Sequence, residues 1–213
     1  MQKRSIALSF IMMLAVFLTV ASTSIAACPF CPSVSITLAE EVAQADAVVL
    51  VQWVRGTKPT ESSKGNTTFE IKQIHQNFKN RFAPGDKLVL PRFYSGLVGN
   101  LFLLFGEKVL VIDWCRPIEI SELSFNYMAQ SPSPEIPTVK RLQYFAKFLE
   151  YPDELIANDA FSEFANASYE DVTAIADKIP ADKIRKWLQS DNTPPIRLGF
   201  YGLLMGLSGN AAD

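Results

Sequence analysis

Ala47-Val48-Val49-Leu50-Val51-Gln52-Trp53-Val54 is the stretch on which the predicted fold rests. Its first five residues are all apolar, and three of them are β-branched valines. A run of this kind is typical of a strand that is buried in a sheet. The preceding segment, Pro32 to Asp46, places Leu38, Val42 and Ala45 near one helical face, so a short helix is expected to lead into the strand.

Further strands are predicted downstream at short spacing. The alternation of Thr67 to Phe78 slips in phase at Gln73-Ile74, which predicts a β-bulge. Ala83-Pro84-Gly85-Asp86 is typical of a tight turn, because proline presets φ and glycine tolerates positive φ. The remaining strand candidates are Lys87 to Phe93, Asn100 to Phe105 and Lys108 to Trp114, with a hairpin expected at Gly106-Glu107 between the last two.

Five closely spaced strands without alternating helices predict a small antiparallel barrel or sandwich. Ser131 to Pro137 contains three prolines and is interpreted as a stiff linker. Beyond it, apolar residues recur at helical spacing. We therefore expect a β plus α, two-domain chain, with a barrel over residues 28–130, a proline-rich linker over 131–137 and an all-α domain over 138–213.

Short helices separated by prolines are expected in the second half of the chain. Ser168 followed by Asp171 resembles a capping box that opens one of them. Such helices resemble HEAT-type repeat pairs, and a compact helical bundle is the alternative. The last helix, from Pro194-Pro195 to Gly209, is apolar nearly all round. It is expected to be the centre of the bundle, to be covered by another chain, or to lie beside helices of a longer form; the interpretation favours a truncated C-terminus.

Charge and histidine content exclude several classes of function. The formal net charge is −2, with 20 basic and 22 acidic residues, so the counterion-release contribution to nucleic-acid affinity is missing and no DNA or RNA partner is expected. His75 is the single histidine, which excludes a multi-histidine metal site, and no metal or other cofactor is expected. His75 is interpreted as a surface or edge residue rather than as a general base, because no positioned nucleophile accompanies it.

Residues 1–27 have the three-part plan of a secretory signal peptide. Lys3 and Arg4 precede an apolar run from Ile6 to Val20, and small residues follow. Removal of this segment leaves 18 of the 20 basic residues against 22 acidic ones, a formal net charge of −4. The sequence thus predicts a mildly acidic exported protein, periplasmic or extracellular.

Ile25-Ala26-Ala27-Cys28 resembles the lipobox of bacterial lipoproteins, in which the cysteine is acylated. Acyl chains contribute roughly 0.8 kcal/mol per buried methylene and would tether the chain to a membrane through Cys28. Ordinary cleavage after the small residues would release the protein instead. Both outcomes remain open at this stage.

Three cysteines in an oxidising compartment leave one unpaired. If Cys28 is acylated, Cys31 and Cys115 remain as a pair that closes a loop of about 84 residues, worth roughly 4 to 5 kcal/mol in the chain-entropy model. Without acylation, either Cys28 or Cys31 pairs with Cys115, or Cys28 and Cys31 bridge each other.

Cys28-Pro29-Phe30-Cys31 also has the spacing of a redox-active CxxC pair. A thioredoxin-type motif follows a buried strand and precedes a long helix within a βαβ unit, whereas this motif stands at the mature N-terminus. We therefore favour a structural role for the cysteines and keep a thiol–disulfide oxidoreductase using Cys28 and Cys31 as the alternative.

From Cys28 to Ser124 the chain resembles the netrin-like, TIMP-like variant of the OB-fold found in bacterial exported proteins. The resemblance rests on the CxxC, the Leu38-Ala39-Glu40-Glu41 helix, the Ala45 to Val51 and Phe69-Glu70-Ile71 strands, and the Pro84 to Leu90 turn and strand. It implies a disulfide between the N-terminal cysteines and the barrel, similar to the Cys31 and Cys115 pair. Metalloprotease inhibitors of this family chelate the zinc of their target with an N-terminal cysteine in a Cys-x-Cys sequence. This chain has Cys-x-x-Cys instead, so the resemblance does not imply inhibition.

Together with the helical part, the chain resembles a group of uncharacterised bacterial exported proteins, most closely over Ile196 to Gly206. That resemblance implies an architecture and no activity. The function expected from the sequence is a non-catalytic binding protein of the cell envelope with an unknown protein partner. Neither a catalytic nor a cofactor-binding residue is predicted.

Overall fold

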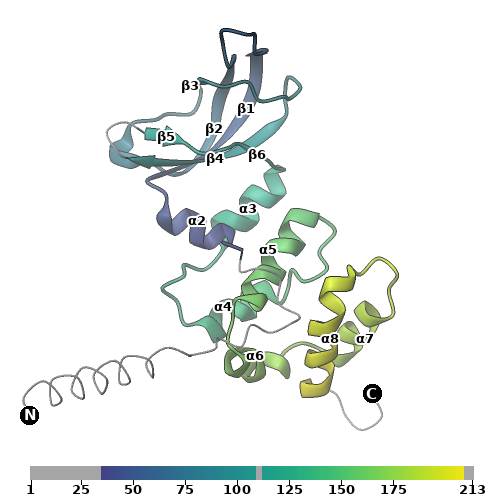
Figure 1. Ribbon diagram of the computed structural model, residues 1–213. Helices are drawn as coiled ribbons and strands as arrows, with labels where there is room; N and C mark the ends of the chain where they lie inside the picture. Colours follow the sequence, from purple (N-terminus) through teal and green to yellow (C-terminus); the bar gives the residue numbers. More distant parts are fainter. Residues whose placement is uncertain (1–34, 109–111, 209–213) are drawn as a thin grey trace, which may run out of the picture. The chain divides into compact units, whose positions relative to one another are not determined.

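The computed structural model describes residues 35–108 and 112–208, which form a curled antiparallel sheet and seven helices (Figure 1). The expected mixture of β and α structure is confirmed. The strands are β1 (Ala47–Thr57), β2 (Asn66–Gln76), β3 (Lys87–Leu90), β4 (Leu101–Lys108), β5 (Ile112–Trp114) and β6 (Ile118–Glu119). The helices are α2 (Leu38–Gln44), α3 (Glu122–Gln130), α4 (Thr138–Phe145), α5 (Glu154–Ala165), α6 (Tyr169–Ala176), α7 (Ala181–Leu188) and α8 (Pro195–Ser208), with a 3-10 turn η1 (Phe78–Asn80) after β2.

Strand β1 is the centre of the sheet. It pairs with β2 on one side and with β4 on the other, in the order β3-β2-β1-β4-β5, and β6 also pairs with β4. Each residue from Ala47 to Val51 is 0% exposed. Because successive side chains of a strand point to opposite faces, both faces of β1 are covered. This double burial explains why the run is continuously apolar rather than alternating.

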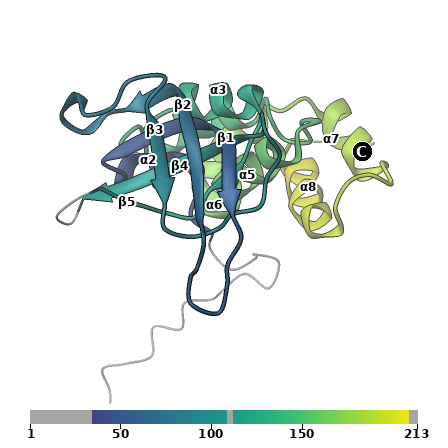
Figure 2. The ribbon, with the colours of Figure 1, turned by 90° about the horizontal axis from the view of Figure 1, so that it is seen from above.

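The two faces of the sheet belong to two hydrophobic clusters. The inner face of the curl carries a cluster around Val49, Val51 and Phe69. The outer face, with Val48 and Leu50, joins the larger cluster that includes residues of the helices. Figure 2 looks down on the sheet, with helices behind it. Full burial of each such side chain stabilises the fold by roughly 1.5 to 3 kcal/mol.

Strand β2 contains the irregularity expected from its sequence. The β1–β2 register shifts between Val48 and Val49 and again between Leu50 and Val51. Val49 and Leu50 themselves pair with Ile74 and Gln73, so the two shifts bracket the predicted phase slip. The extra residues bend the strand and increase its twist, which helps the sheet to curl.

The turn before β3 is also confirmed, whereas the predicted hairpin turn at Gly106-Glu107 is wrong. Gly85 has φ of +94° and, with Asp86, forms a glycine bulge opposite Ile71. Gly106, by contrast, lies within β4 and pairs with both Ala47 and Trp114. A Cβ at Gly106 would meet the Trp114 ring at 2.9 Å, so the glycine serves side-chain packing and not a turn.

Side-chain caps define where several helices begin. Thr37 and Glu40 form a capping box that starts α2, which is shorter than the predicted Pro32 to Asp46 helix. Ser168 accepts a hydrogen bond from the Asp171 amide and caps α6, as expected. Asp153 caps α5 by accepting hydrogen bonds from the Leu155 and Ile156 amides.

Helix α3 was not predicted from the sequence. Ser121 caps it, and its nine residues bury Phe125, Tyr127 and Met128 in the larger cluster. Its amphipathic pattern is weak, so tertiary burial rather than a strong local pattern stabilises this helix. The Ser131 to Pro137 segment then connects α3 to α4, and side chains on both sides of it belong to one hydrophobic cluster.

A buried ionic network attaches α8 to the preceding helices. The Arg197 guanidinium donates to Glu150 Oε1 at 2.6 Å and to Asn158 Oδ1 at 2.6 Å. The Tyr201 hydroxyl donates to the same Glu150 oxygen at 2.6 Å. The Arg197 side chain is only 3% exposed and also lies over the Phe161 ring. Ionised groups buried to this degree need such partners, so the network fixes the position of α8.

The opposite face of α8 is not covered by the described residues. Ile196, Leu198 and Leu203 are exposed, and nothing lies within 4 Å of where a Cβ would stand at Gly202. The expectation that α8 is the covered centre of a bundle is therefore wrong for the described part of the chain. Within residues 35–108 and 112–208, no helix combines the length and hydrophobicity needed to span a membrane.

We expect Arg197→Leu to lower the free energy of unfolding by about 3 to 5 kcal/mol, because the variant removes the guanidinium that pairs with the largely buried Glu150 side chain. Urea denaturation measures this change. Lys178→Met removes an ion pair in which both side chains are mostly exposed, and it should change stability by less than about 0.5 kcal/mol. A loss below about 1 kcal/mol for Arg197→Leu would contradict a structural role for the network.

Candidate functional site

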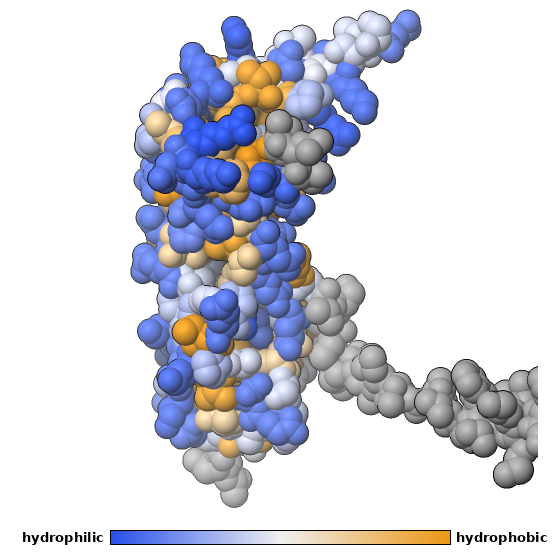
Figure 3. Space-filling model, turned by 90° about the vertical axis from the view of Figure 1, so that its left-hand side faces the viewer, coloured by the Kyte–Doolittle hydropathy of each residue, from blue (hydrophilic) through white to orange (hydrophobic). Residues whose placement is uncertain are grey.

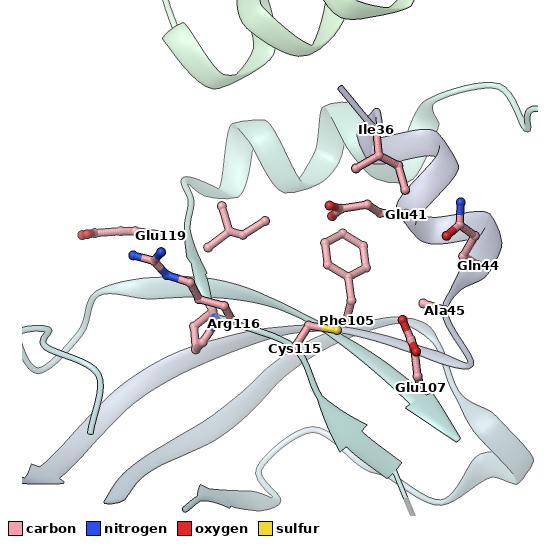
Figure 4. A pocket seen from close by; sticks show the side chains of 11 residues that line it. Ile36, Glu41, Gln44, Ala45, Phe105, Glu107, Cys115, Arg116 and Glu119 are labelled. Carbon is pink, nitrogen blue, oxygen red and sulfur yellow. The ribbon is translucent and has the colours of Figure 1, made fainter. Parts of the chain in front are cut away.

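A pocket of about 610 Å³ lies between α2 and the outer face of the sheet. Glu41 and Gln44 of α2 line one side of it, and Phe105 and Glu107 of β4 line the other. The segment that connects β5 to β6, from Cys115 to Pro117, completes the wall together with β6. In Figure 4, the Cys115 sulfur lies beside the Phe105 ring, and Glu41 projects from α2 toward the same ring.

Backbone pairing holds Cys115 in this pocket. Its amide donates to the Phe105 carbonyl at 2.9 Å and continues the β4–β5 ladder by one residue. Cys115 is an exposed residue, and its thiol forms no disulfide within the described part of the chain. The one predicted site residue that the structure describes is thus a free thiol at the rim of a pocket.

The surroundings of Cys115 disfavour its thiolate. Partial burial of the thiol is the largest cause of a raised pKa. The negative charges of Glu107, Glu41 and Asp113 raise the pKa further. A thiol is nucleophilic mainly as the thiolate, so Cys115 is a weak nucleophile near neutral pH.

Glu41 is the second unusual group in the pocket. Its Oε2 atom is buried and has no hydrogen-bond partner among the described residues. Burial raises the pKa of this carboxyl, and the charge of Asp159 raises it further. Although Glu41 stands in the first turn of α2, where the helix dipole favours an acid, desolvation outweighs that effect here.

Cys28 and Cys31, the other predicted site residues, lie outside the described residues. The described chain begins immediately before the pocket, since Ile36 is one of the residues that line it. Ile36 and Cys115 therefore share a pocket although 79 positions of the sequence separate them. The structure thus places Cys115 in the same pocket as the second of the described residues.

His75 has no catalytic surroundings. It is an exposed residue of β2, at the register shift beside Gln76, and partial burial of its ring lowers the pKa of the imidazole. Its groove is otherwise lined by aliphatic, proline and neutral polar side chains and by Glu135. No group of three or more histidine, cysteine or acidic side chains in the described ranges has the geometry of a metal site.

A second group of titratable residues is buried beneath the start of α2. Asp159 accepts hydrogen bonds from the Leu38 amide at 2.7 Å and from the Tyr127 hydroxyl at 2.8 Å. Glu163, one turn further along α5, forms an ion pair with Arg141. Burial raises the pKa values of both carboxyls. Because every one of these contacts joins elements of the fold, the cluster is structural.

No protein-family model, curated protein or solved structure matches the chain.

Sequence reasoning did not find most of the pocket. Phe105 and Glu107 belong to a predicted strand and to a predicted turn, and nothing in their spacing relates them to Glu41 of α2. The three come together because α2 packs against β4. One signal was present in the sequence, because two acidic residues, Glu107 and Asp113, precede Cys115 within eight positions. In the structure they are partners across β4 and β5, and both raise the pKa of the Cys115 thiol.

We expect Glu107→Gln to accelerate alkylation of Cys115 by iodoacetamide in the reduced protein near pH 8. Glu107 has the largest of the three charge effects on Cys115, so removal of its charge lowers the thiol pKa. One pKa unit changes the thiolate fraction roughly tenfold in this range. Mass spectrometry of the peptide that contains Cys115 measures the rate. Glu122→Gln, an exposed substitution on α3, is the matched control and should leave the rate unchanged; equal rates for both variants would show that Glu107 does not act on the thiol.

We expect Asp159→Asn to become more stable relative to the unsubstituted protein as pH rises from 4 to 7. A carboxyl whose folded-state pKa is raised binds more protons in the native than in the unfolded state, so its contribution is present at low pH and is lost as pH rises through the folded-state pKa. The asparagine lacks this titration. Urea unfolding of both proteins at several pH values measures the difference; a difference that stays constant with pH would contradict the raised pKa.

Proposed function

We propose that the chain is an exported, non-catalytic binding protein of the cell envelope. In this proposal Cys28 is acylated and holds the protein on a membrane, while a Cys31–Cys115 disulfide fastens the N-terminal segment to the sheet. The observation that carries the proposal is that Cys115 and Ile36 line the same pocket.

The length of the intervening chain supports the disulfide. Four residues lie between Cys31 and Ile36, and the five residue steps from one to the other span roughly 17 Å when extended. A cysteine at position 31 can therefore reach a thiol in the pocket that Ile36 already lines. Such a bridge would close a loop of about 84 residues and stabilise the fold by roughly 4 to 5 kcal/mol in the chain-entropy model.

The chemistry of Cys115 supports fastening rather than catalysis. Burial and three neighbouring carboxylates keep the sulfur in its protonated form, which makes it a poor nucleophile. In an oxidising compartment a disulfide removes the ionisable thiol altogether. A disulfide sulfur carries no charge, so it is compatible with acidic surroundings in which a thiolate is unfavourable.

Membrane attachment through Cys28 is a further part of this proposal. Acyl chains on Cys28 each contribute roughly 0.8 kcal/mol per buried methylene, and two or three chains give stable anchoring. Only two residues separate Cys28 from Cys31. The disulfide would thus hold the sheet close to the bilayer surface, with the helices available to a protein partner at the envelope.

Two finer features of the architecture belong to this proposal. We interpret the curled sheet as a netrin-like OB barrel that is open on one side; the support is that β1 pairs with both β2 and β4 in a curled sheet of six strands. We interpret α4 to α8 as HEAT-like pairs, because α7 packs on α8, α4 packs on α5 and α6, and prolines precede or begin α4, α7 and α8.

Intact-mass analysis and a non-reducing peptide map of the protein purified from its membrane fraction test the proposal. We expect a mass increase from acyl chains on Cys28 and a Cys31–Cys115 cross-linked peptide. Cys115→Ser should lower the free energy of unfolding by about 4 kcal/mol under non-reducing conditions and by far less when both proteins are reduced.

A Cys28–Cys31 bridge with Cys115 free would overturn the proposal. Turnover of that bridge in an insulin-reduction assay would establish the alternative, a thiol–disulfide oxidoreductase. An unprocessed chain with all thiols reduced would contradict export as well.

A further inference from the structure

The curled sheet has an opening between strands β3 and β5. Among the described strands, each of these two pairs on one side only, β3 with β2 and β5 with β4. Residues of both strands line one cavity of about 710 Å³. Two strand edges therefore face a shared space.

The free edge of β3 presents backbone groups at known positions. The Ile71 amide donates to the Asp86 carbonyl at 2.9 Å, so the backbone of Asp86 is directed at β2. Backbone direction alternates along an antiparallel strand. Leu88 and Leu90 therefore also bond toward β2, while the N–H and C=O groups of Lys87 and Val89 point away from β2, to the free edge.

The same argument fixes the free edge of β5. The Cys115 amide donates to Phe105 of β4 at 2.9 Å, so the next residue back, Trp114, directs its backbone away from β4. Ile112 does likewise by alternation. Each edge thus offers two residues whose peptide groups have no strand partner in the described sheet.

Charge at the opening has one predominant sign. Lys64, Lys87 and Arg92 line the cavity, are exposed and form no ion pair in the described part of the chain. Asp113 is the acid among the lining residues. Glu70 lies opposite Lys87 in the β2–β3 ladder and reduces the positive charge there. Glu70 already forms an ion pair with Lys72, however, at 2.7 Å. The local excess is positive although the whole chain carries a formal charge of −2.

The floor of the opening is apolar, and packing and hydrogen bonds fix the residues that form it. Leu88, Leu90 and Trp114 line the cavity and belong to the inner cluster of the sheet. Tyr94 is positioned from both sides, since its amide donates to Thr67 Oγ1 at 2.7 Å and its carbonyl accepts from Trp53 Nε1 at 3.1 Å. Figure 3 shows hydrophobic residues exposed between strongly hydrophilic ones on the part of the surface that belongs to the sheet.

We propose that this opening binds an extended, acidic segment of a partner protein, which adds to the free edge of β3 as a further strand. The unpaired peptide groups of Lys87 and Val89 would bond its main chain, and apolar side chains of the segment would lie on the floor of the cavity. Its carboxylates would pair with Lys64, Lys87 and Arg92 at the rim. This inference deepens the proposed binding function by giving the partner's chemistry, and it depends on the sheet opening rather than on the cysteines.

A peptide fits the opening better than other occupants do. A nucleic acid would use the cations and aromatic rings but would leave the strand edges without partners. A second copy that paired through β3 would bring Lys87 and Arg92 of two chains together, and lysine on an edge strand opposes such pairing. An acidic extended segment satisfies the backbone groups and the charges together.

The probe is a fluorescently labelled octapeptide of alternating glutamate and valine, with its remaining terminus blocked, titrated with full-length protein in an anisotropy assay. We expect saturable one-to-one binding that weakens severalfold between low and high salt. Replacing its glutamates by lysine, or methylating its alternate amide nitrogens, should each weaken binding at least tenfold. Equal binding of the lysine peptide would overturn the proposal, as would tighter binding of an oligothymidylate of matched length.

Paired variants separate the edge from its charges. Val89→Pro removes an outward N–H that does not bond to β2 and should weaken binding at least tenfold, whereas Val89→Ala keeps that N–H and should bind within about threefold of the unsubstituted protein. Lys87→Glu with Arg92→Glu should also abolish binding. Lys147→Glu, in the turn after α4, with Lys183→Glu in α7 makes the same change of charge away from the sheet and should leave binding intact.

Circular dichroism checks whether each variant is folded. If Val89→Pro does not fold, the Lys87→Glu with Arg92→Glu variant tests the proposal. Full affinity in a folded Val89→Pro variant would overturn the proposal. So would a concentration-dependent dimer of the unsubstituted protein that is lost in the Val89→Pro variant. The titration is repeated with oxidised and with reduced protein. Peptide binding that is independent of the thiols, together with an unexpected disulfide map, would refute the Cys31–Cys115 staple while supporting the peptide site.

Discussion

The fold depends on the burial of one strand on both of its faces. Ala47 to Val51 separate the inner cluster of the curled sheet from the larger cluster that includes the helices, and none of the five is exposed. The strand also pairs with neighbours along both edges, so its backbone groups are satisfied within the sheet. A polar residue in this run would lie in one of the two clusters without water, at a cost of several kcal/mol.

The central strand explains where reactive and interactive groups can lie. From Val48 to Val51 both faces and both edges of this strand are used, whereas the outer strands β3, β5 and β6 each pair on one side only among the described strands. Pockets form where the sheet meets other elements. Cys115 follows β5 and faces α2, whereas the positively charged opening lies between β3 and β5. The fastening that we propose and the peptide site that we propose thus use different sides of the same edge strand.

Polar groups inside the helical part specify how the helices pack. Arg197, Glu150 and Tyr201 join α8 to the turn after α4, and Asp159 joins α5 to the first amide of α2. Apolar contacts alone would tolerate several arrangements of short helices, because hydrophobic attraction has no direction. A buried charge accepts only the arrangement that brings its partner, so these few contacts select one packing.

The sequence by itself determined the central strand, the bulge in β2, the turn at Gly85, the cap of α6 and the mixture of β and α structure, because local periodicity and turn chemistry encode each of them. Gly106 was misassigned and α3 was missed, since the Trp114 ring over the glycine and the burial of Phe125 and Met128 depend on residues distant in the chain. Only the tertiary structure brought Cys115 to the pocket of Ile36 and left β3 and β5 without pairing to each other across a shared opening. Strand order and the contact of α2 with the sheet decide those features, and no local pattern records them.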